Sequence, residues 1–309
     1  MNLNIDSLIF LLELFKYDYF DERVFSKLIK TKGMRGFFEH ERARGKDINI
    51  REELEKVIYD GNYKDSYGLY KAKKDLKSLE EDINNIQIYE KYIIEKAMEN
   101  IYKIIPKGMK VKCKIYLFSG GEDGGFTISR NKIYINYANY INNMEELIKI
   151  ISHELYHSRN ISYKNRICFS IKTAFSEYNK VYEIIGKIIE EGLASLVQHG
   201  PTLKVDDPAG TLNDRSLLLI WDEFELLNEI ILDIKGKRKY NKKLENLNIY
   251  AIGYYIVSTI YNTDGVLILD NWTVGLKYKE ILERYIEICN EKGMTSGFNK
   301  DIKGLVINC

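Results

Sequence analysis

Hydrophobic residues recur at helical spacing through the first hundred or so residues of the chain. Near the N-terminus, one apolar helical face is formed by Leu8, Leu11, Leu12 and Phe15. The segment 69–104 alternates charged and apolar residues and contains no proline, which predicts long helical structure. Between these segments, the basic and glycine-dotted stretch from Lys30 to Arg44 predicts an exposed loop. We therefore expect residues 1–105 to form an N-terminal helical region.

The periodicity changes from that of a helix to that of a strand after Pro106. Apolar and polar residues alternate in the next segment, as they do in a half-buried strand. The segments that predict strands are 111–117, 126–129 and 132–137. A glycine-rich turn at 119–125 separates the first two, and a tight turn at 129–132 separates the last two. We expect a small sheet at about 108–140.

Helical periodicity returns downstream of these strands. Asn143, followed three residues later by Glu146, is typical of a helix N-terminus. The apolar stripe of this helix consists of Met144, Leu147, Ile148, Ile151 and Leu155. A connector from Ser158 to about Lys172 leads to a second helix. Its buried side is predicted to consist of Val181, Ile184, Ile185, Ile188 and Ile189.

The last third of the chain is predicted to be helical again. One helix is expected at 217–234, and the basic segment 235–243 after it predicts a solvent-facing loop. A further helix is expected at 249–257, where Gly253 would permit close packing against a neighbouring helix. We expect 266–309 to be a C-terminal helical region that packs on the core.

Composition and charge indicate an ordinary globular protein. Of the 309 residues, 45% are hydrophobic and 29% are charged, which is ample for a substantial core. With 46 basic and 45 acidic residues the net charge is +1, so the balance predicts neither nucleic acid nor an anionic membrane as a partner. The four cysteines form no C-x-x-C pair, and Glu13 and Lys16 interrupt the apolar N-terminus. We expect reduced thiols, no signal peptide, no membrane span and a cytoplasmic location.

The motif H-E-x-x-H at 153–157 carries the candidate chemistry. His153 and His157 are four residues apart, so a helix places both imidazoles on one face, where they can bind the same ion. Zinc accepts imidazole nitrogens at about 2.0–2.1 Å in tetrahedral geometry. Glu154 follows the first histidine directly, so it lies near the metal without binding it and can take a proton from a metal-bound water. The motif predicts a zinc site with a glutamate general base.

A second acidic motif, Glu-Glu-Gly-Leu-Ala at 190–194, follows on the next predicted helix. Together with H-E-x-x-H it resembles the gluzincins, the zincin-class zinc peptidases whose third ligand is a glutamate that commonly stands before a glycine. The resemblance implies that Glu191 binds the zinc together with His153 and His157. Glu190 stands where these peptidases usually have asparagine, so either carboxylate remains a candidate. The pair of motifs also resembles uncharacterised bacterial zinc-peptidase families that carry H-E-x-x-H followed by Glu-Gly-Leu-Ala.

The resemblance also implies a substrate-binding strand. Zincins place an edge strand near the zinc, and this strand pairs with an extended peptide through backbone hydrogen bonds. The candidate edge consists of Gly124, Gly125, Phe126 and Thr127, where glycines would let a substrate backbone approach closely.

The helix at 249–257 is similar to a Gly-Tyr helix in the same bacterial families. Gluzincins often use a tyrosine hydroxyl to hydrogen-bond the developing oxyanion. This resemblance implies Tyr254 as the first candidate and Tyr250 as the second, while simple helix packing is the alternative for both.

These observations predict an α+β, predominantly helical zincin-like fold with a small sheet packed on the H-E-x-x-H helix. The catalytic core is expected at 106–265. The expected function is a zinc metallopeptidase that acts on a peptide or protein substrate. One alternative is an inactive zincin-like scaffold that binds a peptide or regulates a partner. Another is a regulatory protein whose basic segments, 30–44 and 235–243, bind nucleic acid with a steep salt dependence.

Overall fold

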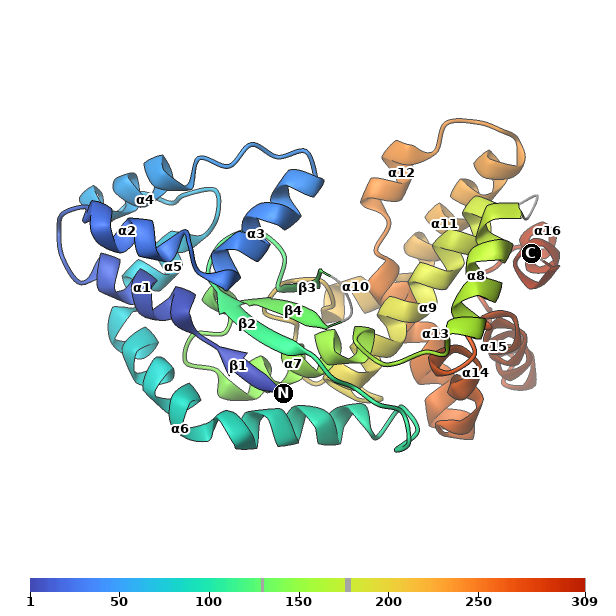
Figure 1. Ribbon diagram of the computed structural model, residues 1–309. Helices are drawn as coiled ribbons and strands as arrows, with labels where there is room; N and C mark the ends of the chain where they lie inside the picture. The colour runs from blue at the N-terminus through green and yellow to red at the C-terminus, as the bar shows by residue number, and fades with distance from the viewer. Residues whose placement is uncertain (129–130, 176–178, 309) are drawn as a thin grey trace. The chain divides into compact units, whose positions relative to one another are not determined.

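The computed structural model describes residues 1–128, 131–175 and 179–308 (Figure 1). The chain divides into two compact units. The first contains Met1–Asn100 and Val111–Arg159, and the second contains Ile101–Lys110 and Asn160–Cys309. The functional boundaries predicted after residues 105 and 265 stay predictions. Within the described ranges, no helix combines the length and the apolar character needed to cross a membrane.

The first unit surrounds a small sheet with helices. Its elements are β1 (Asn2–Asn4), α1 (Asp6–Phe15), α2 (Glu22–Leu28), α3 (Lys32–Ala43), α4 (Ile50–Tyr59), α5 (Leu69–Lys74), α6 (Leu76–Ile101), β2 (Lys114–Phe118), β3 (Gly125–Thr127), β4 (Lys132–Asn136), the 3-10 turn η1 (Tyr137–Asn139) and α7 (Met144–His157). Helices predominate beside a small mixed sheet, which confirms the α+β class. The zincin-like character of the fold stays a prediction.

The sheet has the strand order β1-β2-β4-β3. The β1–β2 and β2–β4 pairs are parallel, whereas β3 is antiparallel to β4. Strands form where three were predicted, and β3 lies at the edge of the sheet as expected. The half-buried character predicted for the first strand is wrong, because Tyr116 is buried as well as its neighbours Ile115 and Leu117. The turn predicted at 129–132 includes 129–130, which lie outside the described residues. Strand β1 was not predicted, because its three residues are too few to establish a period of two.

The loop predicted from Lys30 to Arg44 is wrong, because most of this stretch forms helix α3. Thr31 caps the helix by accepting a hydrogen bond from the Met34 N–H. The glycines that suggest a loop instead permit close packing. A Cβ on Gly36 would lie 2.0 Å from the Tyr134 ring, so α3 can approach the sheet this closely only with glycine there.

Helices α3 and α7 cover opposite faces of the sheet (Figure 1). Successive side chains of a strand point to opposite faces. In β4, Tyr134 contacts α3 at Gly36, while its neighbours Ile133 and Ile135 belong to the other face and are fully buried. Helix α7 packs against β3 and β4 on that second face. The H-E-x-x-H helix therefore packs on the sheet as predicted.

Helices are the only regular secondary structure among the described residues of the second unit. Its elements are α8 (Tyr163–Phe175), α9 (Asn179–His199), α10 (Asp214–Leu218), α11 (Ile220–Lys235), α12 (Asn241–Asn246), α13 (Ile249–Asp264), the 3-10 turn η2 (Leu267–Leu269), α14 (Asp270–Thr273), α15 (Lys279–Glu291) and α16 (Lys300–Asn308). Helix α9 confirms the second predicted helix, and its predicted apolar side is buried.

Three predictions in this unit are corrected. The basic loop expected at 235–243 is shorter than predicted, because Lys235 is the last residue of α11 and α12 begins at Asn241. The connector expected up to about Lys172 contains helix α8, whose apolar residues at helical spacing are exposed: Tyr163, Ile167 and Ile171. The single helix expected at 217–234 is two helices, because the backbone of Leu219 (φ −92°, ψ 17°) leaves the helical range and separates α10 from α11.

Helices α9 and α13 meet at a contact between two glycines. A Cβ on Gly192 would lie 2.3 Å from the carbonyl carbon of Gly253, and a Cβ on Gly253 would lie 2.0 Å from the Ile188 oxygen. The backbones of α9 and α13 are therefore so close at this point that no side chain fits between them. This confirms the prediction that Gly253 permits close helix packing.

The glycine contact predicts a large stability difference between two glycine variants. Gly253→Ala should destabilise the protein by about 3 kcal/mol, because the added methyl group forces the helices apart. Urea unfolding followed by circular dichroism measures the loss. Gly304→Ala in helix α16 is the matched control, since nothing lies within 4 Å of its Cβ position. It should stabilise the helix by up to about 1 kcal/mol. Equal urea-unfolding midpoints for Gly253→Ala and Gly304→Ala would contradict the close contact between α9 and α13.

Candidate metal centre

Helix α7 carries the H-E-x-x-H motif in its last turns. At its start, the Asn143 side chain accepts a hydrogen bond from the Glu146 N–H at 3.2 Å, which confirms the predicted cap. Three fully buried residues fix the rotation of the helix about its axis: Leu147, Ile151 and Leu155. With this rotation, the rings of His153 and His157 lie side by side, with their centroids 5.1 Å apart. The spacing of four residues thus brings both imidazoles together, as predicted.

The motif glutamate, Glu154, lies against edge strand β3. Its side chain is almost fully buried, with a relative exposure of 5%. The Thr127 hydroxyl donates a hydrogen bond to Glu154 Oε2 at 3.1 Å. A Cβ on Gly125 would lie 3.0 Å from both Cγ and Oε1 of Glu154. Two predicted strand residues therefore contact the predicted general base.

The opposite side of β3 packs into an aromatic stack. Phe126 stacks against the His40 ring of α3, with centroids 3.9 Å apart and planes 4° from parallel. On β4, Tyr134 stacks against the same phenyl ring at 5.2 Å. Before β3, the Gly124 carbonyl accepts a hydrogen bond from the Asn136 N–H at 2.9 Å. The four predicted edge residues are thus held by α3, by β4 and, through Glu154, by α7.

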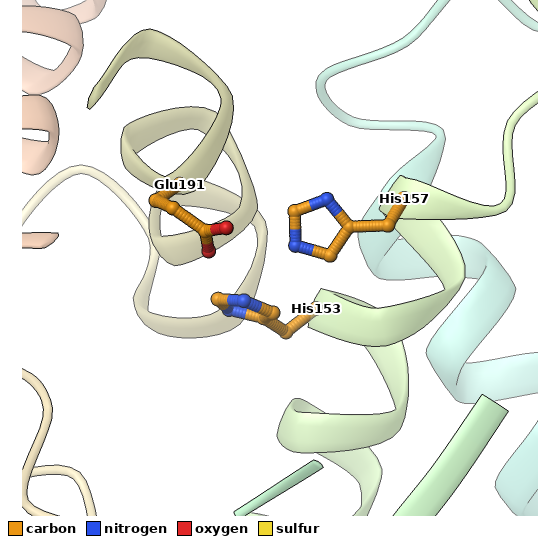
Figure 2. Close-up of side chains that lie close together, drawn as sticks. All are labelled: His153, His157 and Glu191. Carbon is orange, nitrogen blue, oxygen red and sulfur yellow. The ribbon is translucent and has the colours of Figure 1, made fainter. Parts of the chain in front are cut away.

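The two neighbouring glutamates of α9 have different surroundings. The indole N–H of Trp272 donates a hydrogen bond to Glu190 Oε2 at 2.6 Å. Glu191 instead belongs to a group of potential metal ligands with His153 and His157. One ligand atom from each of these three residues lies within 4.8 Å of the other two. Figure 2 shows their three side chains pointing toward one another.

This donor set fits a zinc ion chemically. Two imidazoles and one carboxylate form a common ligand set of catalytic zinc, and such a site keeps a further position for water. Other divalent ions also accept two imidazoles and a carboxylate, so the set itself does not select zinc.

A second group of potential ligands consists of His40, Glu41 and Asp123. Here two cations already neutralise the carboxylates. Arg44 Nη1 lies 2.5 Å from Asp123 Oδ2, and Lys46 Nζ lies 3.6 Å from Glu41 Oε2. The hydrogen bond with His40 and the charge of Arg44 hold the pKa of Asp123 below its usual value. We therefore interpret this group as an ion-pair cluster that ties the loop before β3 to α3.

The two candidate tyrosines lie one turn apart on α13. Tyr254 is 3% exposed, and its hydroxyl donates a hydrogen bond to the Gly200 carbonyl at 2.9 Å. Burial raises the pKa of this hydroxyl. Gly200 follows the last residue of α9 in the left-handed conformation, so the contact joins α13 to the end of α9. It favours the packing alternative for Tyr254. An oxyanion role for either Tyr254 or Tyr250 stays a prediction.

The described cysteines are free thiols: Cys113, Cys168 and Cys289. Cys309 lies outside the described residues. Burial raises the pKa of Cys113 to about 11, so this thiol is protonated at neutral pH. A protonated thiol is a poor metal ligand, because the thiolate is the form that binds.

Two supporting residues of the site were not predicted from the sequence. Nothing in the local sequence connects Trp272 with Glu190. His40 supports the edge strand from a segment that was predicted to be a loop. An amphipathic interpretation of α3 could have found this helix, because buried Met34 and Phe37 lie three residues apart.

Comparison with known proteins identifies a family. Residues 25–293 match the family DUF5700, described as "Putative zinc dependent peptidase". The match covers most of the chain and includes His153, His157 and Glu191. No curated protein and no solved structure matched the chain. The chain therefore belongs to the DUF5700 family.

Proposed function

We propose that the protein is a gluzincin-type zinc metallopeptidase with a zincin-like catalytic core. The observation that carries the proposal is the grouping of ligand atoms from His153, His157 and Glu191 within 4.8 Å of one another. Glu154 follows His153 on the same helix, in the position of a general base. The family description supports zinc dependence and peptide hydrolysis in general terms. In this proposal the substrate is a peptide or a protein.

The proposal assigns the third ligand to Glu191 rather than to Glu190. Glu190 accepts a hydrogen bond from Trp272, which directs that carboxylate to a protein donor. Glu191 belongs to the group of potential ligands with the two histidines. Successive residues of a helix point about 100° apart, so the two carboxylates do not share a direction.

In the proposed reaction, Glu154 first accepts a proton and later donates the same proton. Zinc held by the three ligands would supply a water whose pKa is lowered from about 15.7 toward about 7. Glu154 would act as the general base that takes a proton from the attacking water, and its carboxyl group would then give this proton to the leaving nitrogen as the C–N bond breaks. In the proposal, Tyr254 or Tyr250 hydrogen-bonds the developing oxyanion.

Strand β3 is the proposed substrate edge. Within the sheet of the described residues, it pairs with β4 on one side and has no strand on the other. An extended peptide can add to such an edge through backbone hydrogen bonds. Gly124 and Gly125 present no side chain that would hinder its approach. The same edge would serve an inactive peptide-binding scaffold, which differs from the peptidase in having no turnover.

The ligand assignment predicts the metal content of four proteins. Elemental analysis of the purified wild type should find about one zinc per chain. His157→Ala and Glu191→Ala should lose most of this zinc, because each removes a ligand. Glu190→Gln is the matched control and should keep the zinc, since the amide oxygen can still accept the hydrogen bond from Trp272. Zinc lost from Glu190→Gln but kept by Glu191→Ala would reverse the assignment. A wild type that takes up no zinc on reconstitution would refute the site.

The general-base assignment predicts a variant that keeps zinc but loses turnover. Glu154→Gln preserves the size of the side chain and removes its basicity. Its zinc content should equal that of the wild type, while cleavage should fall by at least about 100-fold. Digestion of a peptide library followed by mass spectrometry measures the rate. Wild-type turnover by this variant would contradict the assignment. A zinc-loaded wild type that cleaves no peptide of the library would favour the scaffold alternative.

A further inference from the structure

We propose that strand β3 positions the general base, with Thr127 as the residue that holds the Glu154 carboxylate in its orientation. This inference rests on the proposed function for the role of Glu154. It adds a positioning residue to that role, and it gives β3 a task besides binding substrate.

The two oxygens of Glu154 meet two different residues of the strand. Oε2 accepts a hydrogen bond from the Thr127 hydroxyl at 3.1 Å. Oε1 lies 3.0 Å from the position that a Cβ on Gly125 would occupy. The terminal torsion of a glutamate has broad preferences and does not by itself fix the carboxylate plane. A donor at one oxygen and a strand backbone close to the other restrict this torsion. The strand therefore limits how the carboxylate can turn.

The alternation of the strand makes this arrangement possible. Residues two apart in a strand point to the same face, so Gly125 and Thr127 both face α7. Phe126, between them, faces α3 and lies in the stack with His40 and Tyr134. Each face of β3 is thus used by a different helix.

The position of Thr127 is fixed from the α3 side of the sheet. The parallel stack of Phe126 on His40 restrains β3 at its centre. Just before the strand, Asp123 binds His40 Nε2 at 2.8 Å and Arg44 Nη1 at 2.5 Å. Because all of these residues belong to the first unit, α3 acts on Glu154 through β3. Helix α3 would then contribute to catalysis by holding this strand.

One strand would then orient both partners of the reaction. A peptide paired with the free edge of β3 takes its register from the strand backbone, and the carboxylate of the base takes its orientation from Thr127. Positioning a catalytic group relative to a bound reactant contributes strongly to rate. Loss of the Thr127 hydroxyl should therefore lower kcat more than it changes KM.

The kinetic test compares Thr127→Val with Thr127→Ser in the zinc-loaded protein. Valine keeps the branched shape and removes the hydroxyl, whereas serine keeps the hydroxyl. Thr127→Val should lower kcat about 10- to 100-fold, as loss of a supporting hydrogen bond at a metal site does, with zinc content unchanged and KM within about twofold. Thr127→Ser should retain most of the wild-type kcat. Wild-type kcat in Thr127→Val, or equal loss in both variants, would overturn the proposal.

A second measurement needs no activity. Urea unfolding of the metal-free wild type, Thr127→Val, Glu154→Leu and the double variant forms a double-mutant cycle. If the hydroxyl holds the carboxylate, Thr127→Val should lower the unfolding midpoint in the wild-type background. The same change should have little effect in the Glu154→Leu background, where the acceptor is absent. Strictly additive effects would overturn the contact. A coupled cycle in a protein without peptidase activity would support the contact and assign the failure to the proposed function.

Gly125→Ala tests the other oxygen. Its Cβ would lie 3.0 Å from Glu154 Oε1, so the carboxylate must move and kcat should fall by at least about tenfold. Gly61→Ala, in the same unit, is the control and should behave as the wild type, because nothing lies within 4 Å of its Cβ position. Unchanged kcat in Gly125→Ala would contradict the restriction of the carboxylate by the strand.

Discussion

Close packing at glycine positions, where no side chain separates an element from its neighbour, is the constraint that both units share. In the first unit, Gly36 lets α3 contact the ring of Tyr134, and Gly125 lets β3 lie against Glu154. In the second unit, Gly192 and Gly253 bring α9 and α13 into backbone contact. A methyl group on Gly36, Gly192 or Gly253 would overlap its neighbour, and interiors packed to crystal density cannot absorb such an overlap without a shift. A methyl group on Gly125 would press against the Glu154 side chain.

The segment Glu-Gly-Leu-Ala on α9 combines a proposed ligand with this packing. Gly192 places its face of α9 against α13, and Glu191 is the adjacent residue in the sequence. Neighbouring residues on a helix point about 100° apart, so packing at the glycine sets the direction of the glutamate. The hydrogen bond from Trp272 fixes Glu190 in the same turn. The glycine after the proposed ligand is thus explained by helix packing rather than by chain flexibility.

Strand β3 of the first unit also combines two proposed roles, since it is the proposed substrate edge and it contacts Glu154. Its three residues have one strand neighbour, yet contacts on both faces hold it. The aromatic and ionic contacts come from α3, and the contact with Glu154 comes from α7. Such support would let a short edge strand bind a peptide in the proposed function without being displaced. Substrate binding and orientation of the base would then depend on the same few residues.

Some features of this protein follow from the sequence by itself because they are local. The spacing of His153 and His157 and the Asn143 cap each involve residues a few positions apart, and the helical period converts the spacing of the histidines directly into a shared face. Tertiary structure alone decided the rest. Glu190 accepts a hydrogen bond from Trp272, which lies 82 residues away in the sequence. The Tyr254 hydroxyl donates a hydrogen bond to the carbonyl of Gly200, which lies 54 residues away. Glycines that suggest a loop in 30–44 serve helix packing instead. Such outcomes depend on which surfaces meet in the folded chain, and no local period contains that information.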